Sequence, residues 1–238
     1  MWLIAEYQPV TLFSFRSGIA TSSGAKTLFL PTPFAIRTAL LDAAIRTNGL
    51  AAGAAAFAWI KKLSIAVRGP ERIVVTNLFT KILKPTRKKE SEHRMDRTIA
   101  FREYAQLEGS LALAFGVPRD TDIMELSALL RQINYFGKRG SFFQLVTAPH
   151  TAKKLPEGFV EMDGVYIKDT MIRARGTEAF VLGIMQMMDD WGENLTFEKI
   201  DIHTDKKIEL IKDRVRKGVL IPYRLVRSSK GFSYYERV

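Results

Sequence analysis

The sequence predicts an α+β protein in which strands and helices alternate over the first two-thirds and strands dominate the remainder. Apolar residues at three- and four-residue spacing predict helices over 33–48 and 122–134. Alternating apolar residues predict long strands over 72–83 and 98–117. Because two prolines bound the polar stretch 149–156, we expect residues 1–149 to form the first unit and residues 150–238 a smaller, β-rich second one.

The amino-acid composition limits the classes of molecule that the protein is expected to bind. The 36 Lys and Arg residues outnumber the 25 Asp and Glu residues, which gives a formal net charge of +11. Fold stability does not require such a bias, whereas a polyanionic partner explains it, with nucleic acid ahead of an anionic membrane surface. The chain has no cysteine, so disulfides and thiolate metal sites are excluded. The longest apolar run, 50–60, is too short to span a bilayer, and we expect a cytoplasmic protein with no membrane partner.

The first unit begins with strands over 2–8 and 10–15, followed by a Gly/Ser/Thr loop over 17–26. A short apolar strand ends at Leu30, where Pro31 interrupts it. Thr32 is a suitable cap for the helix that follows, and Pro33 falls in the first turn, where a helix tolerates proline. We expect this helix to end at Asn48-Gly49 and a second helical piece to cover 51–62.

The long strands flank the most charged stretch of the chain, residues 84–97. Six cations and three carboxylates give this stretch a local charge of +3, and Met95 is its one large apolar residue. We therefore expect an exposed basic loop at the tip of a protruding hairpin over 72–117. With strands over 64–67 and 141–147, the order is β, α, β, β, α, β, which is the ferredoxin-like order shared by RNA-recognition modules.

The second unit is less well defined. The pattern favours strands over 159–167, 196–203 and 219–226, a mixed segment over 177–191, and a helix over 205–217.

Several positions suit an anion, although each also has an ordinary structural explanation. Arg37 lies one turn inside a helix whose free N-terminal amides attract phosphate, but it also suits a solvated helix face. Gly137 and Gly140 enclose Lys138 and Arg139, so backbone and side chains together could hold phosphate; the alternative is an ordinary turn. Arg16 ends a strand, and Ser17 and Gly18 beside it could offer backbone amides to a phosphate. Tyr104 could stack on a base, whereas we assign Phe101 to packing.

Four segments in this order resemble the CRISPR-associated Cas5 family, a branch of the RAMP superfamily. They are residues 11–18, 29–40, 101–104 and 135–143, and the second contains the Pro31-Thr32-Pro33 sequence that resembles the family's start of the first helix. The resemblance covers the first two-thirds of the chain and is strongest toward the archaeal-type (type I-A-like) branch, in which an Arg-Glu-Tyr segment follows a variable loop.

The resemblance implies a non-catalytic subunit of a type I CRISPR surveillance complex (Cascade), with the projecting hairpin as the family's thumb. Such a subunit binds the 5′ handle of CRISPR RNA and contacts the backbone and large subunits; contact with target DNA stays open. We expect no cofactor and no metal. The residues that we assign to RNA binding are Arg16, Ser17, Lys26, Arg37, Lys84, Arg87, Lys88, Lys89, Arg94, Arg97, Arg102, Tyr104, Lys138 and Arg139.

Two alternatives stay open. One branch of the family cuts repeat RNA without metal, using histidine, tyrosine and lysine, but the histidines here, His93, His150 and His203, match no motif. The second alternative is a basic scaffold that touches only proteins or duplex DNA. A metal nuclease built from Asp189, Asp190, Asp201 and His203 is a weaker interpretation, because two potential ligands on one hydrophilic strand are commonly coincidence.

Overall fold

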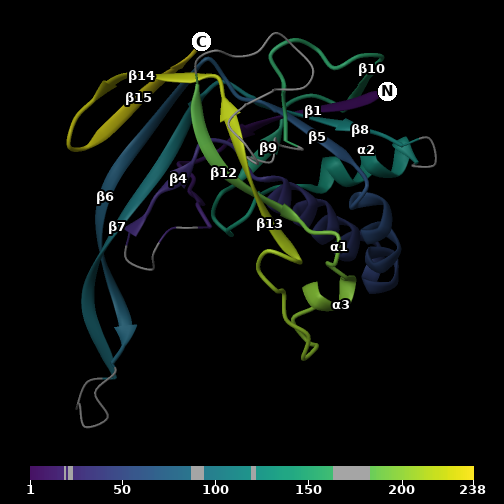
Figure 1. Cartoon of the computed structure of the whole chain (residues 1–238), viewed down its shortest axis with the longest axis horizontal. Coiled ribbons are helices and arrows are strands. Elements are labelled where there is room, and N and C mark those ends of the chain that lie inside the picture. The colour runs from purple at the N-terminus through teal and green to yellow at the C-terminus, as the bar shows by residue number, and fades with distance from the viewer. Residues whose placement is uncertain (19, 21–23, 87–93, 119–121, 163–182) are drawn as a thin grey trace.

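The computed structural model of the chain describes residues 1–18, 20, 24–86, 94–118, 122–162 and 183–238. It has an α+β architecture in which strands predominate (Figure 1). The described strands form two larger sheets and two separate pairs of strands. None of the helices within the described ranges is both long and apolar enough to cross a lipid bilayer.

The first sheet has the order β10-β1-β8-β5-β11, and β9 also pairs with β1. All of its pairings are antiparallel. In this sheet, the helix α1 (Pro33–Ile60) lies in the connection from β1 to β5, and α2 (Ile123–Gln132) in that from β8 to β9. The strands are β1 (Trp2–Pro9), β5 (Ser64–Arg68), β8 (Leu111–Gly116), β9 (Phe143–Leu145), β10 (His150–Ala152) and β11 (Val160–Glu161).

Both faces of this sheet bury apolar side chains. Leu3, Ala5 and Tyr7 belong to the main core, which includes the helices, whereas Ile4 belongs to a smaller cluster with Phe159. This split follows from the strand, in which successive side chains point to opposite faces. The Tyr7 hydroxyl donates to the carbonyl of Leu130 at 2.7 Å, and burial raises the pKa of this phenol.

A side chain caps the start of each long helix, and the cap at Thr32 is the one that the sequence predicts. In α1 (Pro33–Ile60) the Thr32 hydroxyl accepts a hydrogen bond from the Ala35 amide at 3.2 Å. Gly49, with φ 85° and ψ 174°, interrupts α1 and divides it into two arms, which confirms the predicted break. In α2 (Ile123–Gln132) the Asp122 carboxylate accepts from the Met124 amide at 2.8 Å.

The second sheet has the order β14-β15-β6-β7-β3. Its strands are β3 (Gly24–Ala25), β6 (Arg72–Pro85), β7 (Met95–Glu108), β14 (Tyr223–Ser228) and β15 (Phe232–Arg237). The pair β6–β7, which we call the ribbon, extends well beyond the body (Figure 1). The predicted hairpin therefore exists, but it ends at Glu108 rather than Val117. Gly109, with φ 117°, turns the chain into β8, which belongs to the first sheet.

The remaining described elements complete the body. The short strands β2 (Phe15–Arg16) and β4 (Thr27–Leu28) pair with each other. The hairpin of β12 (Ile184–Trp191) and β13 (Arg214–Ile221) packs against α1 through β12, and the single-turn helix α3 (Phe197–Ile200) lies between the two strands in the chain.

Two expectations for the last third are wrong. Residues 205–213 are irregular and β13 begins at Arg214, where a helix over 205–217 is predicted; α3 occupies the predicted strand 196–203. Asp213 explains much of this. Its buried carboxylate accepts hydrogen bonds from Lys199 Nζ at 2.8 Å and from the Glu209 amide at 2.7 Å. These side-chain hydrogen bonds hold the segment in a turn instead of a helix.

Hydrogen bonding does not follow the predicted division at residue 149. The strands β10 and β11 extend the first sheet, and β15 pairs with β6 of the ribbon. Met188, Trp191 and Val219 belong to the same core as the first two-thirds of the chain.

Candidate nucleic-acid interface

The turn between α2 and β9, which we call the glycine turn (residues 137–140), lies beside the start of α1. Gly137 and Gly140 have φ 67° and 100°, values that favour glycine. A Cβ atom at Gly137 would lie 3.8 Å from Ala35, in the first turn of α1, and 3.8 Å from Phe15. The turn thus presents exposed Lys138 and Arg139 next to the positive end of a helix dipole.

Aromatic residues on both sides of the glycine turn hold it against the core. Phe136 and Phe143, which precede and follow it, are buried, and their rings contact each other at a centroid distance of 5.3 Å. Phe143 also stacks on Phe15 at 5.9 Å. Because the flanking side chains are held, Lys138 and Arg139 extend from a rigid support.

Residues 24–27 lie against the ribbon. β3 runs parallel to β7, with Ala25 opposite Arg102, and the Glu103 carboxylate accepts a hydrogen bond from the Thr27 amide at 2.9 Å. Arg16 and Lys26 are exposed, and Arg16 donates to the carbonyl of Ala20 at 2.9 Å. Ser17 is buried, and its amide bonds to the carbonyl of Lys26. Its side chain is therefore a poor candidate for an RNA contact.

The assignment of Arg37 to RNA binding is wrong. Its side chain is only 5% exposed, Nε lies 2.8 Å from the Asp190 carboxylate, and Nη1 donates to the Ile60 carbonyl at 2.6 Å. Arg37 therefore connects the start of α1 to β12 and to the C-terminal end of α1. The periodicity of the helix could not reveal this partner, because Asp190 lies 153 positions away in the chain.

The ribbon carries part of the predicted basic set. Arg94 and Arg97 are exposed, Lys84 is partly exposed opposite Asp96, and Arg102 and Tyr104 lie nearer the root, partly buried. The loop is shorter than predicted, because β6 continues to Pro85 and β7 begins at Met95. The predicted residues Arg87, Lys88 and Lys89 lie outside the described residues, as does His93.

The outer part of the ribbon also exposes apolar side chains that the sequence analysis did not assign. Phe79, Leu83 and Ile99 are 76%, 60% and 62% exposed. Phe79 contacts Phe101 edge to face at 5.4 Å. A pocket of about 290 Å³ lies among these strands, and Lys81 and Arg97 are among its lining residues. In the sequence, these exposed apolar residues look the same as those of a buried strand.

Two further cations approach the interface from β13, where the sequence analysis predicts a helix. The Arg216 guanidinium donates to the carbonyl of Gly18 at 2.8 Å, so β13 supports the segment that follows Arg16. The Arg214 guanidinium lies 4.4 Å from the ring centroid of Phe34 and donates to Asp189. The basic triplet at 214, 216 and 217 was a usable sequence signal for them.

The acidic residues considered as metal ligands are engaged with protein groups. Asp189 pairs with Arg214, and Asp190 pairs with Arg37 and Lys217. Asp201 accepts a hydrogen bond from the His203 amide at 2.9 Å. Among the residues that the structure describes, no three His, Asp or Glu side chains gather as a metal site would require.

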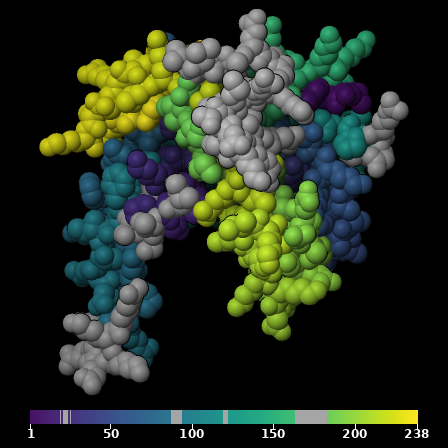
Figure 2. Space-filling view, viewed as in Figure 1, coloured from purple at the N-terminus to yellow at the C-terminus, as the bar shows by residue number. Residues whose placement is uncertain are grey.

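The structure brings some of the predicted cations together and separates others. Arg16, Lys26, Lys138 and Arg139 belong to segments packed around the start of α1, and β3 links that region to Arg102 of β7. The outer ribbon instead stands away from the body, with open space between it and β13 (Figure 2). This arrangement offers a basic surface on the body and a projecting basic arm, the geometry that a single strand of phosphates could follow.

Known proteins resemble this chain as follows. The CRISPR-associated protein Cas5 of Archaeoglobus fulgidus is 26% identical over 227 residues, covering 91% of this chain and 95% of the relative. A CRISPR protein crystal structure from Archaeoglobus fulgidus aligns with a TM-score of 0.43 and 11% identity, covering 100% of this chain and 92% of that one. A chain of a CRISPR RNA-guided surveillance complex aligns with a TM-score of 0.43 and 14% identity, covering 93% and 90%. No protein-family model matches the sequence.

This relative is a CRISPR-associated protein, and its similarity confirms the resemblance to the Cas5 family that four sequence segments predict. It extends that resemblance beyond the first two-thirds to nearly the whole chain.

Proposed function

We propose that the chain is a non-catalytic subunit of a type I CRISPR surveillance complex that binds the 5′ handle of CRISPR RNA and contacts the backbone and large subunits. The observation that carries the proposal is the glycine turn, which presents Lys138 and Arg139 beside the start of α1. The net charge of +11 and the resemblance to Cas5 support it.

The proposal includes a ferredoxin-like RNA-binding core. The first sheet supports this through its antiparallel order β10-β1-β8-β5, with α1 and α2 in the two crossovers and β9 sharing the edge position beside β1. The ribbon then corresponds to the thumb. Its exposed Arg94 and Arg97 are suited to a phosphate backbone, since each neutralised phosphate releases counterions.

The test is binding of a fluorescently labelled single-stranded RNA with the sequence of the repeat-derived handle, measured by anisotropy over a salt series. The double variant Lys138→Gln/Arg139→Gln removes two exposed cations from the glycine turn. We expect weaker binding and a slope of log Kobs against log salt that is shallower by about 1.4, because each lost phosphate contact contributes about 0.7 for a single strand.

A matched control is Lys153→Gln/Lys154→Gln, which removes two adjacent exposed cations elsewhere and changes the net charge equally. Equal losses in both double variants would reduce the effect to net charge. Absence of binding by the unaltered chain, or a salt-independent affinity, would overturn the proposal.

A further inference from the structure

The two faces of the second sheet differ in what covers them. Ile73, Val75 and Leu107 point to one face and are buried in the main core. Their neighbours in the strands point to the opposite face, because side chains alternate and directly paired residues share a face. The opposite face, which we call the outer face, carries Val74, Thr76, Tyr104, Gln106, Arg227, Phe232 and Tyr234.

Three aromatic residues share the outer face. Phe232 pairs with Thr76, which pairs with Tyr104, so the two aromatic residues lie two strand spacings apart, about 10 Å. Tyr234 follows Phe232 on the same face of β15, about 7 Å along the strand. All three rings are partly exposed.

These rings differ from the aromatic residues on the core face of the same sheet. Tyr235 contacts Phe29 at a centroid distance of 4.5 Å, and Tyr223 contacts Phe29 at 5.9 Å. Within the described ranges, none of the three outer-face rings stacks on another aromatic ring. The outer face thus offers unoccupied π surface on a rigid sheet.

A β-bulge brings a cation to the same face. The register between β14 and β15 shifts between Leu225 and Arg227, so that Arg227 lies opposite Tyr234. Regular pairing would place Val226 there instead. Arg227 is exposed, and no described carboxylate forms an ion pair with it. Bulges commonly re-aim a side chain, and this one adds a positive charge to an aromatic row.

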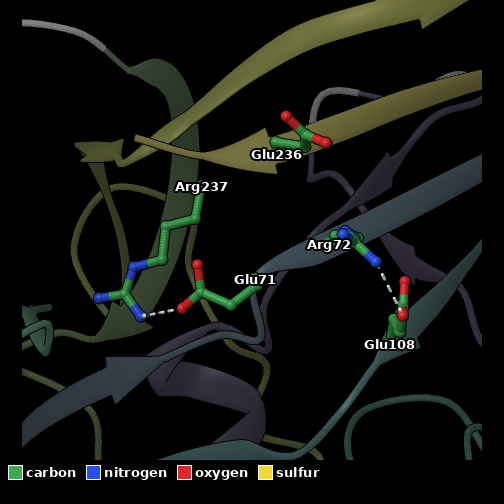
Figure 3. Close-up of a pocket in the computed structure, with 5 residues that line it drawn as sticks. All are labelled: Glu71, Arg72, Glu108, Glu236 and Arg237. Atoms are coloured by element: carbon green, nitrogen blue, oxygen red, sulfur yellow. Dashed lines mark hydrogen bonds and ion pairs between the residues drawn. The ribbon is translucent and has the colours of Figure 1, made fainter.

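A charged row limits this surface at the end of the sheet nearest the body. Arg224, Glu236, Arg72 and Glu108 lie in register across the four strands, and Arg72 lies 3.1 Å from Glu108. Figure 3 shows this pair beside Glu71 and Arg237 in a pocket of about 560 Å³. The two arginines of this row are paired with its two carboxylates, so the row offers phosphate no net positive charge. The Tyr234 hydroxyl donates to Glu236 at 2.8 Å, which anchors the ring at the border.

We propose that the outer face of the second sheet is a stacking surface for single-stranded RNA, with Tyr104, Phe232 and Tyr234 receiving bases and Arg227 receiving phosphate. This inference rests on the proposed function and adds a second contact region, on the C-terminal hairpin β14–β15, that none of the predicted cations occupies. Aromatic side chains on an open sheet stack unpaired bases without strict sequence preference, and polar Thr76 and Gln106 between the rings suit a wet interface.

The test compares two double variants in anisotropy titrations with a labelled, mixed-sequence, single-stranded 12-nucleotide RNA. Phe232→Leu/Tyr234→Leu keeps apolar volume but removes both rings, and we expect roughly tenfold weaker binding, given the typical contribution of one stacked base. Phe232→Tyr/Tyr234→Phe keeps both rings and is expected to bind within about twofold of the unaltered chain. Arg227→Gln should reduce the salt slope by about 0.7, whereas Arg131→Gln, on α2, should not.

A second measurement does not depend on variants. Photocrosslinking with 4-thiouridine RNA, followed by mass spectrometry, should place crosslinks at Tyr104, Phe232 or Tyr234. If Lys138→Gln/Arg139→Gln weakens binding while the leucine double variant binds normally and crosslinks avoid the outer face, this inference is overturned and the proposed function stands. If the unaltered chain binds no RNA, both fail.

Discussion

Two regions of the molecule use positive charge in different ways. At the junction of α1, β12 and β13, Arg37 and Lys217 lie inside or near the core, and both reach Asp190. At the glycine turn, Lys138 and Arg139 are exposed, and no described carboxylate pairs with them. The comparison teaches that the excess of Lys and Arg is not one surface property: part of it holds the body together, and part remains for a partner.

The largest expected effect tests the buried side of this comparison. Arg37→Ala leaves the buried Asp190 without its closest partner, and we expect a loss of about 3 kcal/mol in the free energy of unfolding, measured by urea titration. Arg131→Ala, at an exposed position of α2, should change it by no more than about 0.5 kcal/mol. If Arg37→Ala were neutral for stability but weakened RNA binding, the two regions would not differ as described.

A pH-dependent effect should identify a second buried charge. The hydrogen bond from Lys199, followed by that from the Glu209 amide, holds the pKa of Asp213 below its ordinary value. A carboxylate whose pKa is depressed by folding stabilises the protein above its unfolded pKa, about 3.9, and this stabilisation disappears as pH falls through the folded pKa.

Asp213→Asn should therefore lower the thermal midpoint by a constant amount between pH 5 and 7, relative to the unaltered chain, and the difference should shrink below about pH 4. A difference that stays the same down to pH 2 would mean that the carboxylate charge contributes nothing. Asp205→Asn, at an exposed position of the same segment, is the matched control.

Replacing exposed cations, unlike replacing Arg37, should weaken RNA binding and leave stability nearly unchanged. Lys81→Gln/Arg97→Gln on the outer ribbon should leave the free energy of unfolding within about 0.5 kcal/mol. The same variant should bind handle RNA more weakly, with a salt slope reduced by up to about 1.4. Unchanged binding would restrict the RNA surface to the body and sharpen the comparison to the glycine turn alone.

The smallest expected effect is none at all. Repeat RNA incubated with the purified chain in EDTA should remain intact on a denaturing gel. Specific cleavage that disappears in His93→Ala would identify His93 as a general acid or base. The chain would then be a metal-independent endoribonuclease.

Local signals in the sequence predict the local structure well. Thr32 and Asp122 cap their helices, Gly49 divides α1, and the long alternating strands form a hairpin. The helix caps and the break at Gly49 depend on neighbours within a few positions. The helix predicted over 205–217 is wrong because the hydrogen bonds of the Asp213 side chain, rather than the apolar spacing, decide the conformation there.

The candidate site shows where such reasoning stops. Gly137 and Gly140 indicate a turn around Lys138 and Arg139, and the structure has a turn there with both cations exposed. The partners of Arg37 and Arg216 could not be predicted from the sequence, because the packing of β12 and β13 brings Asp190 to Arg37 and Arg216 to the carbonyl of Gly18. The sequence analysis assigned Tyr104 to RNA binding but not Phe232 or Tyr234, because these three residues share one face only when β15 joins the ribbon.

The break in α1 has a consequence for how this body can respond to a partner. A straight helix of 28 residues would be about 42 Å long, far beyond the reach of one side chain, yet Arg37 in its first turns donates to the carbonyl of Ile60 at its last. The chain therefore doubles back at Gly49, and a single guanidinium clasps the two ends together. A displacement imposed on the start of α1 would be transmitted through Arg37 to Asp190 and to β12, which carries it.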